Sequence, residues 1–242
     1  KPGWYRIAPH VHTVHSDGRL TPAEVIALGK ASGLDGIVST DHNTTSALLH
    51  WGEVQDPEFL VINGVEVTYG QGHWNIFGLD PHAWIDFRIH HNDTLRYRKA
   101  VAKARKAGRL LVANHPYNLD FLYDVTPMDG IEVRNSAWSP ANERAVELWH
   151  TLLVSGNRKF AVASTDFHRG GNIASPHTVV RAEALSAEAV IAAIAAGRSY
   201  VARDASVEIG MQVRNSATPV QHADIGDTLL RSGGMQAEFR SN

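Results

Sequence analysis

The chain has 242 residues, with 23 lysine or arginine residues against 25 aspartate or glutamate residues and a formal net charge of −2. This balance excludes the strongly basic surface of a general nucleic-acid binder, so nucleic acid is expected only as a nucleotide or oligonucleotide substrate. The apolar runs are much shorter than the roughly 20 residues of a membrane-spanning helix. The absence of cysteine excludes disulfides, thiolate metal ligands and a cysteine nucleophile.

The start of the chain leaves its location open. It begins with Lys1 and carries no recognisable leader segment. We therefore expect a soluble protein that is cytoplasmic, or exported after removal of a leader.

Short β-rich segments alternate with helical segments along most of the chain. The first strand is predicted at residues 7–11, and the first helix follows Thr21, where Pro22 and Glu24 complete the pattern of a capping box. Further strands are predicted at 37–40, 60–67, 74–79, 110–113, 131–133, 160–165, 178–182 and 199–202. Further helices are predicted at 45–54, 93–107, 142–155 and 186–196.

This alternation favours a parallel sheet. About seven or eight strand–helix units in one domain favour a barrel over an open doubly wound sheet, and no glycine-rich dinucleotide fingerprint supports the latter. We predict an α/β barrel over residues 1–204. Residues 205–242 lack the alternation and are predicted to form a β-rich or extended tail.

Imidazole and carboxylate side chains are concentrated at the ends of the predicted strands. His10 and His12 lie two residues apart on one strand and therefore share a face, and Asp166 and His168 repeat that spacing. Because the carboxyl ends of barrel strands meet at one rim, we expect such side chains to converge there. The candidate ligands are His10, His12, Asp17, His42, Glu66, His73, His115, Asp166 and His168.

Nitrogen and oxygen donors without sulfur suit zinc, manganese or iron. Nine donors are too many for one tetrahedral ion and are enough for two or three divalent ions, with Glu66 or Asp166 as a bridge. A single pair of this kind is as often surface decoration, but five such groups after strands favour a hydrolytic metal centre. His15 is expected either beside this centre or exposed. The remaining histidines are expected on the surface: His50, His82, His90, His91, His150 and His222.

The segments "HVHTVHSDG", "TDHN", "GVEVT", "NHP" and "STDFH" are similar to the ordered motifs of the PHP superfamily, named for polymerase and histidinol phosphatase. The resemblance covers residues 5 to 204 and implies a distorted seven-stranded β/α barrel that resembles a TIM barrel and holds up to three metals. It implies three ligand sets: His10, His12, Glu66 and Asp166; Asp17, His42 and His168; and Glu66, His73 and His115, with Glu66 as the bridge.

Within that superfamily the chain resembles a branch that includes carbaryl-type carbamate hydrolases. The segments "GWYRIAPHVHTVHSDGRLTP" and "GQGHWNIFGLD" carry this similarity. That branch often has "GDLH" where this chain has Ala8, Pro9 and His10, which retains the ligand His10 but changes the backbone of the strand.

The expected reaction is hydrolysis by a metal-bound hydroxide held by His10, His12, Glu66 and Asp166. Arg134 is the first candidate to bind a phosphate through its planar guanidinium, with an ion pair to Glu132 or Asp129 as the structural alternative. Arg19 comes next. His177 is a candidate to supply the proton to the leaving group.

Three functions remain open at this point. The first is a phosphoesterase acting on small phosphomonoesters or nucleotides. The second is a carbamate or aryl-ester hydrolase using the same centre, with an apolar pocket. The third is a metal-binding module without catalysis. Aromatic residues that could line an apolar pocket are Trp74, Trp84, Tyr117, Phe121, Tyr123 and Trp138.

Overall fold

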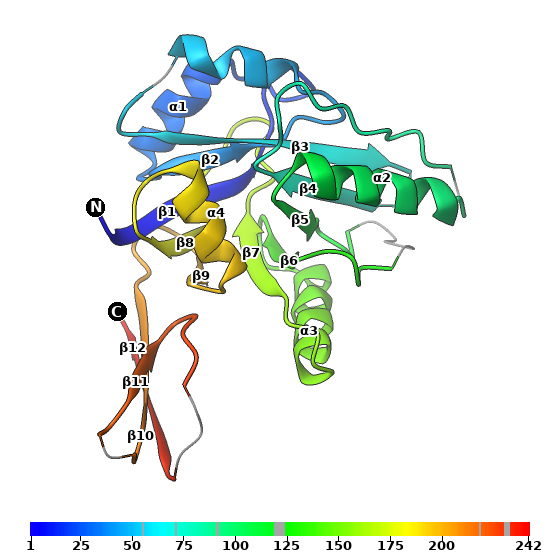
Figure 1. Ribbon diagram of the computed structural model, residues 1–242. Coiled ribbons are helices and arrows are strands. Elements are labelled where there is room, and N and C mark those ends of the chain that lie inside the picture. Colours follow the sequence, from blue (N-terminus) through cyan, green and yellow to red (C-terminus); the bar gives the residue numbers. More distant parts are fainter. Residues whose placement is uncertain (55, 71, 91, 119–123, 218, 230–232) are drawn as a thin grey trace.

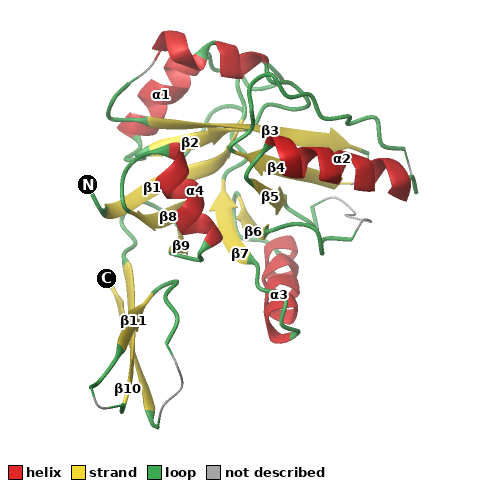
Figure 2. Ribbon diagram, in the orientation of Figure 1, coloured by secondary structure: helices red, strands yellow, loops and turns green. Residues whose placement is uncertain are grey.

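The computed structural model describes residues 1–54, 56–70, 72–90, 92–118, 124–217, 219–229 and 233–242. A mixed nine-stranded sheet curves into a nearly closed barrel, and a separate three-stranded sheet follows it in the chain (Figure 1). Helices cover the outside of the larger sheet (Figure 2). The predicted α/β barrel is therefore confirmed.

The barrel sheet has the strand order β7-β6-β5-β4-β3-β2-β1-β8-β9. Its strands are β1 (Gly3–Val11), β2 (Gly36–Ser39), β3 (Leu60–Tyr69), β4 (Gly72–Phe77), β5 (Leu110–Ala113), β6 (Gly130–Asn135), β7 (Phe160–Ser164), β8 (His177–Ala182) and β9 (Ser199–Ala202). The helices are α1 (Pro22–Ala31), α2 (Thr94–Ala107), α3 (Pro140–Val154) and α4 (Ala187–Ala195), with the 3-10 helices η1 (Ser46–Leu49) and η2 (Trp51–Val54). None of the helices in the described ranges is long and apolar enough to cross a membrane.

The sheet differs from the prediction in strand number and direction. It has nine strands, matching the nine predicted segments, instead of the seven that the resemblance implies, and β8 pairs antiparallel with β1 and β9 antiparallel with β8. β3 ends at Tyr69 and β4 begins at Gly72, a connection too short for the crossover that parallel pairing requires. β4 therefore runs antiparallel to both β3 and β5.

The predicted helix over residues 45–54 is wrong in type. The segment forms η1 and η2, which bury Ala47, Leu48 and Trp51. Gly52 has a low helix propensity and disfavours one continuous α-helix here.

β1 closes the barrel because it pairs with different segments along its length. Its first half pairs antiparallel with β8, as far as Ile7 opposite Thr178. Beyond that point the Phe167 amide donates to the His10 carbonyl at 3.2 Å, and the His12 amide donates to the Phe167 carbonyl at 2.8 Å. The segment after β7 thus meets the carboxyl end of β1.

A bulge around Pro9 decides which way the β1 histidines point. Ala8 pairs with Ile37 and Val11 pairs with Ser39, so three steps along β1 match two along β2. Proline donates no backbone hydrogen bond and is tolerated inside a sheet at such bulges. The bulge shifts the alternation by one residue, which turns His10 toward the barrel interior.

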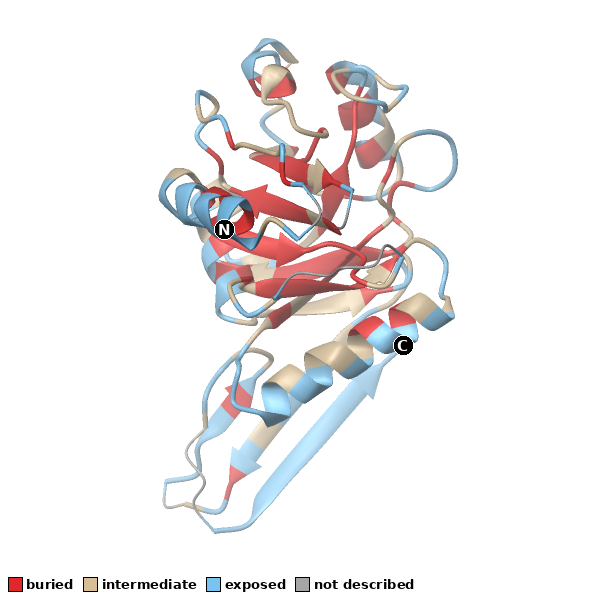
Figure 3. Ribbon diagram, turned by 90° about the vertical axis from the view of Figure 1, so that its right-hand side faces the viewer, coloured by how far each residue is buried: buried red, intermediate tan, exposed pale blue. Residues whose placement is uncertain are grey.

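Two apolar clusters lie on opposite sides of the barrel sheet. The inner cluster joins side chains of most of its strands, among them Ile7, Val38 and Ile62, to α4, which closes the barrel at the end opposite the predicted site. The outer cluster packs the sheet against α1 and α2. Buried residues accordingly dominate the strands of the barrel (Figure 3).

The last strands are β10 (Ile209–Asn215), β11 (His222–Asp224) and β12 (Met235–Ser241), antiparallel in the order β11-β10-β12. This sheet lies apart from the barrel in Figure 1, and β12 is exposed throughout. Arg181 on β8 pairs with Asp224 at 3.2 Å and Asp227 at 2.8 Å, which ties the two parts together. We propose that residues 205–242 form a separate unit.

Replacement of Thr21 by alanine is expected to lower the free energy of unfolding by about 1 kcal/mol. Thr21 accepts from the Glu24 amide, and Glu24 accepts from the Thr21 amide at 2.8 Å, which completes the predicted capping box of α1. Urea denaturation measures the change. The control is Thr151→Ala, at an exposed position inside α3, which is expected not to destabilise the chain. An unchanged unfolding midpoint for Thr21→Ala would contradict the role of the cap.

Candidate metal centre

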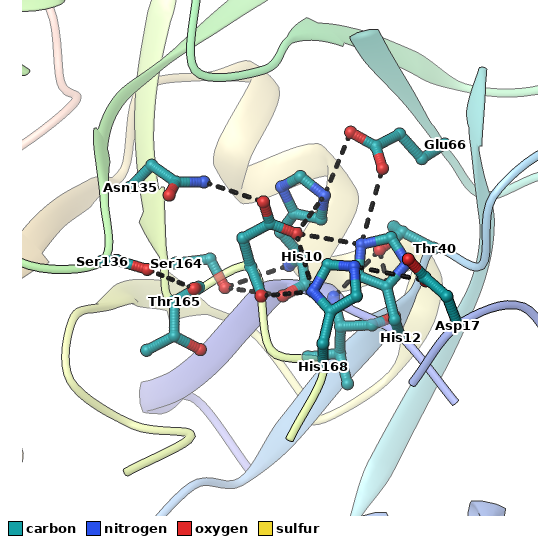
Figure 4. Close-up of polar contacts among 12 residues, drawn as sticks. His10, His12, Asp17, Thr40, Glu66, Asn135, Ser136, Ser164, Thr165 and His168 are labelled. Carbon is teal, nitrogen blue, oxygen red and sulfur yellow. Dashed lines mark hydrogen bonds and ion pairs between the residues drawn. The ribbon is translucent and has the colours of Figure 1, made fainter. Parts of the chain in front are cut away.

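All nine predicted ligands lie at one rim of the barrel. His10, His12, His42, Glu66, His115, Asp166 and His168 lie at or just beyond the carboxyl ends of β1, β2, β3, β5 and β7, and Asp17 lies in the loop after β1. His73 lies at the amino end of β4, which reaches the same rim because β4 runs the other way. Figure 4 shows His10, His12, His168 and Glu66 pointing toward a common centre.

Glu66 is the fully buried carboxylate at this centre. Its Oε1 lies 3.2 Å from His10 Nε2, 3.2 Å from His73 Nδ1 and 3.5 Å from His115 Nε2. Its Oε2 lies 2.8 Å from His42 Nδ1. One carboxylate thus contacts imidazoles carried by four different parts of the sheet.

Asp166 forms a second contact point between the strands. Its Oδ1 lies 3.0 Å from His12 Nε2 and 3.2 Å from His10 Nε2. Asp166 and His115 have φ angles of 54° and 25°, a region that non-glycine residues rarely adopt. Each such conformation costs roughly 1–3 kcal/mol, and such residues cluster at functional sites.

Asp17, His42 and His168 form the more exposed side of the cluster. Asp17 Oδ1 lies 3.2 Å from His168 Nε2 and 3.6 Å from His42 Nε2. The two imidazole Nε2 atoms are 3.5 Å apart. Three elements that are distant in the sequence therefore present their donor atoms to one point.

The compact groups of donor atoms agree with two of the three expected ligand sets. One group, with all donor atoms within 4.8 Å of one another, is His10, His12, Glu66 and Asp166, and another is His12, Asp17, His42 and His168. The third expected set is divided, because His73 groups with His42 and Glu66 whereas His115 groups with His10 and Glu132. The assignment of ions to these sets stays a prediction.

The electrostatics of the cluster are those of buried opposite charges. Burial opposes the charged form of His10, but the carboxylates of Asp166, Glu66 and Glu132 outweigh it and raise the pKa of His10 well above its ordinary value. Burial likewise opposes ionisation of Glu66 and Asp166, yet His10 and the neighbouring imidazoles lower the pKa of both carboxyls. Burial lowers the pKa of His12.

The donor set fits divalent cations. Within the described residues, His12 Nδ1 and His115 Nδ1 are buried without a hydrogen-bond partner, and His10 Nε2, His73 Nδ1 and Glu66 Oε2 have only ion-pair contacts inside the cluster. Buried polar atoms are normally satisfied, and a bound ion is one arrangement that would satisfy these. Imidazole nitrogens and carboxylate oxygens are the ligands that zinc, manganese and iron accept.

The sequence pattern did not identify four residues that support the centre. Asn114 donates from Nδ2 to Glu66 Oε1 at 2.7 Å. Glu132 contacts His10, and Asn135 Nδ2 lies 3.4 Å from Asp166 Oδ2. An acidic or amide residue inside or directly after an apolar strand is the signal that could have found them, and Glu132 had been considered only as a partner of Arg134.

Asp41 is the fourth supporting residue, and it holds the loop that carries Asp17. Its carboxylate is buried and accepts from the Thr13 amide at 2.8 Å, the Thr13 hydroxyl at 2.8 Å and the Ser16 hydroxyl at 2.7 Å. Donors of the loop therefore occupy the carboxylate of Asp41, so Asp41 serves to hold the loop in place.

The three predicted substrate-binding residues lie in different surroundings. The Arg19 amide donates to the His168 carbonyl at 2.8 Å, and Arg19 is exposed beside the cluster. The Arg134 guanidinium lies 5.9 Å from the centre of the Trp138 ring and its Nε donates to the Ser136 carbonyl at 3.4 Å, while burial and the nearby Arg203 lower its pKa. No hydrogen bond or ion pair within the described part of the chain joins Arg134 to the nine candidate ligands.

His177 and the two expected partners of Arg134 also have other contacts. His177 is fully buried, and its Nδ1 lies 2.8 Å from the Ala174 carbonyl. Asp129 pairs with Arg105. Glu132 faces the barrel interior, so the structural ion pair considered for Arg134 is not found among the described residues.

The other histidines and aromatic residues have mostly the expected exposure. His50, His82, His90, His150 and His222 are exposed, and the half-buried His15 bonds Ser46 through Nδ1 at 3.0 Å. Trp74 is a core residue, while Trp84 and Trp138 are exposed and Tyr117 packs under Arg144. His91, Phe121 and Tyr123 lie outside the described residues.

Comparison with solved structures identifies the fold. The chain is similar to a two-domain protein from Bacteroides vulgatus that contains a predicted PHP-like metal-dependent phosphoesterase, with a TM-score of 0.66 and 17% identity over 98% of this chain and 85% of that one. It is also similar to PsfC from Pseudomonas syringae, with a TM-score of 0.61 and 18% identity over 84% and 93% of the two chains.

A third similar structure is an amidohydrolase from Chromobacterium violaceum with bound sulfate, with a TM-score of 0.50 and 19% identity over 69% of this chain and 89% of that one. No protein-family model and no curated protein sequence matches the chain. At these identities the similarity shows a shared α/β barrel fold. The resemblance to the carbaryl-type branch stays a prediction.

Gly18 is expected to tolerate no side chain, because a Cβ there would lie 2.5 Å from both the carbonyl carbon and the carbonyl oxygen of His12. Gly18→Ala should lower the free energy of unfolding by about 1–3 kcal/mol, the range for overpacked sites. Gly52→Ala is the matched control, because a Cβ at Gly52 meets nothing within 4 Å. Equal urea midpoints for the two variants would show that the loop adjusts freely.

Proposed function

We propose that the chain is a metal-dependent hydrolase with a di- or trinuclear centre, acting on small phosphomonoesters or nucleotides. The proposal depends on one observation. Six histidines, two aspartates and one glutamate, the fully buried Glu66, converge at one rim of the barrel. A structural zinc site needs four ligands, so this number of donors favours a catalytic centre with several ions.

Divalent ions at such a centre supply an activated water and neutralise the oxygens of the group under attack. We assign His10, His12, Glu66 and Asp166 to one ion, and Asp17, His42 and His168 to a second. Glu66, His73 and His115 are the expected ligands of a third, with zinc, manganese and iron as the candidate metals.

The exposure of the ligands indicates the side from which a substrate enters. The side chains of His10 and His12 are 1% and 0% exposed, whereas those of His168 and Asp17 are 27% and 59% exposed. The buried ligands exclude water from one side of the centre. We infer that the substrate approaches across Asp17 and His168.

Arg19 is the cation best placed to bind an anionic substrate on that side. Its amide is fixed to the His168 carbonyl, and the exposed Arg19 can reach a phosphate through its planar guanidinium. Arg134, whose guanidinium packs over the Trp138 ring, is the less favourable candidate. Arg19 therefore replaces Arg134 as the first candidate.

The alternative is a carbamate or aryl-ester hydrolase that uses the same centre. It is favoured by the cluster itself, since within the described residues no lysine or arginine side chain contacts any of the nine candidate ligands. The similarity in fold to an amidohydrolase is consistent with attack on a carbonyl. A metal-binding module without catalysis is the third possibility.

Variants His10→Ala and His12→Ala are expected to lose bound metal and hydrolysis while staying folded, because both imidazoles belong to the group of donors that they form with Glu66 and Asp166. Elemental analysis gives the metal content, and assays with a nitrophenyl phosphate, a phosphodiester and an aryl carbamate distinguish the reactions. His82→Ala, at an exposed histidine, is the control. Parental turnover in both ligand variants would refute the proposal, and hydrolysis of the carbamate alone would support the alternative.

Arg19→Ala is expected to reduce kcat/KM for the nitrophenyl phosphate by about 10-fold or more, equivalent to the roughly 1.5–3 kcal/mol of a charged hydrogen bond. Turnover of a neutral aryl ester should change little. Arg134→Ala is the comparison, because the Arg134 guanidinium packs over Trp138 and no hydrogen bond or ion pair within the described residues joins it to the candidate ligands. Equal losses on the charged and neutral substrates would remove the proposed role of Arg19.

A further inference from the structure

Glu132 is the buried carboxylate at the centre that the nine candidate ligands leave out. It lies on β6 and is 2% exposed. Its Oε1 lies 3.2 Å from His10 Nδ1, and its Oε2 accepts hydrogen bonds from the His115 amide at 2.9 Å and from Asn135 Nδ2 at 3.3 Å. One side chain therefore contacts β1, the segment after β5 and the end of β6.

These contacts determine where His10 carries its proton. An ionised carboxylate can only accept hydrogen bonds, so the imidazole facing Glu132 must carry a hydrogen on Nδ1. The other nitrogen, Nε2, lies 3.2 Å from Glu66 Oε1 and 3.2 Å from Asp166 Oδ1. In the neutral ring Nε2 then presents its lone pair to the region between these two carboxylates, where a cation is required.

We propose that Glu132 is a positioning residue that fixes the tautomer and orientation of His10 and thereby sets the affinity of the centre for divalent ions. The inference rests on the metal centre of the proposed function. A carboxylate bonded to the outer nitrogen of a ligating histidine holds the ring and raises the basicity of the ligating nitrogen. Asn135 extends this support, because its Nδ2 lies between Glu132 and Asp166.

A direct ligand role for Glu132 is the competing arrangement, since its donor atom lies within 4.8 Å of those of His10 and His115. Both oxygens of Glu132 already face donors, however. Oε2 already accepts two hydrogen bonds, so an ion there would displace the buried His115 amide at a cost of roughly 1–3 kcal/mol, and an ion at Oε1 would face the hydrogen on His10 Nδ1. The positioning role needs neither change.

The variant Glu132→Gln separates these possibilities, because it keeps the shape of the side chain and replaces one oxygen by an amide. When the amide oxygen accepts from the His115 and Asn135 donors, the NH₂ group faces His10 Nδ1 and favours the tautomer with its hydrogen on Nε2. The affinity for Zn²⁺ or Mn²⁺, measured by equilibrium dialysis and elemental analysis, should fall about 10- to 100-fold. The His10 Nδ1–H signal in ¹H–¹⁵N spectra of the zinc-loaded protein should lose the downfield shift that its hydrogen bond to the carboxylate causes.

Two further variants make the experiment decisive. Glu132→Asp keeps the acceptor but withdraws it by one methylene, so it should retain the Nδ1–H signal with a several-fold loss of metal affinity. Asp35→Asn is the control: the half-buried Asp35 accepts from the Arg6 amide at 2.7 Å at the other end of the barrel. It should keep the parental metal affinity.

The outcomes for the two proposals are distinguishable. A parental protein that takes up neither Zn²⁺ nor Mn²⁺ would contradict the proposed function itself. Normal uptake by the parental protein, with an unchanged affinity and an unchanged His10 signal in Glu132→Gln, would overturn the role of Glu132 alone. If Glu132→Gln does not fold, a full parental affinity in Glu132→Asp overturns it instead.

Discussion

Carboxylates buried side by side need positive charge between them, and the barrel rim is organised around this requirement. Glu66 and Glu132 have almost no exposure, and moving an ion of this kind out of water carries a penalty of several kcal/mol. Imidazoles from several strands surround these carboxylates, and their positive charge offsets the negative charge of the carboxylates. The shifted pKa values of His10 and Glu66 express this mutual dependence, and the same arrangement offers many donors to divalent ions.

The strand topology supplies the geometry that this requirement demands. Antiparallel β4 carries its amino end to the rim and so presents His73, while the other strands present residues from their carboxyl ends. The bulge at Pro9 turns His10 inward. The contact between β1 and the segment after β7 brings Asp166 beside both histidines of β1. Each of these three features is local, and together they bring the side chains into one cluster.

The sequence was informative where a side chain's chemistry is unusual for its position. Histidines placed two apart after an apolar run predicted the rim, and the capping box of Thr21 predicted the start of α1. Strand direction was not predictable from periodicity, because β4 has the same apolar pattern whether it pairs parallel or antiparallel. Glu132 was missed for a related reason: a lone acid next to arginine in a strand suggests an ion pair, and only tertiary contacts show that it faces His10.

The closure of the barrel between β1 and β7 has a consequence for the order of events during synthesis. His10 and Asp166 are separated by more than half of the chain, so the earliest ligands leave the ribosome long before their partners exist. Contacts between such distant segments form late, because the intervening loop must first be ordered. The nascent amino terminus can offer an isolated imidazole pair, but the complete set of candidate ligands arises only when the segment after β7 is in place. The candidate centre is therefore expected to assemble late in folding.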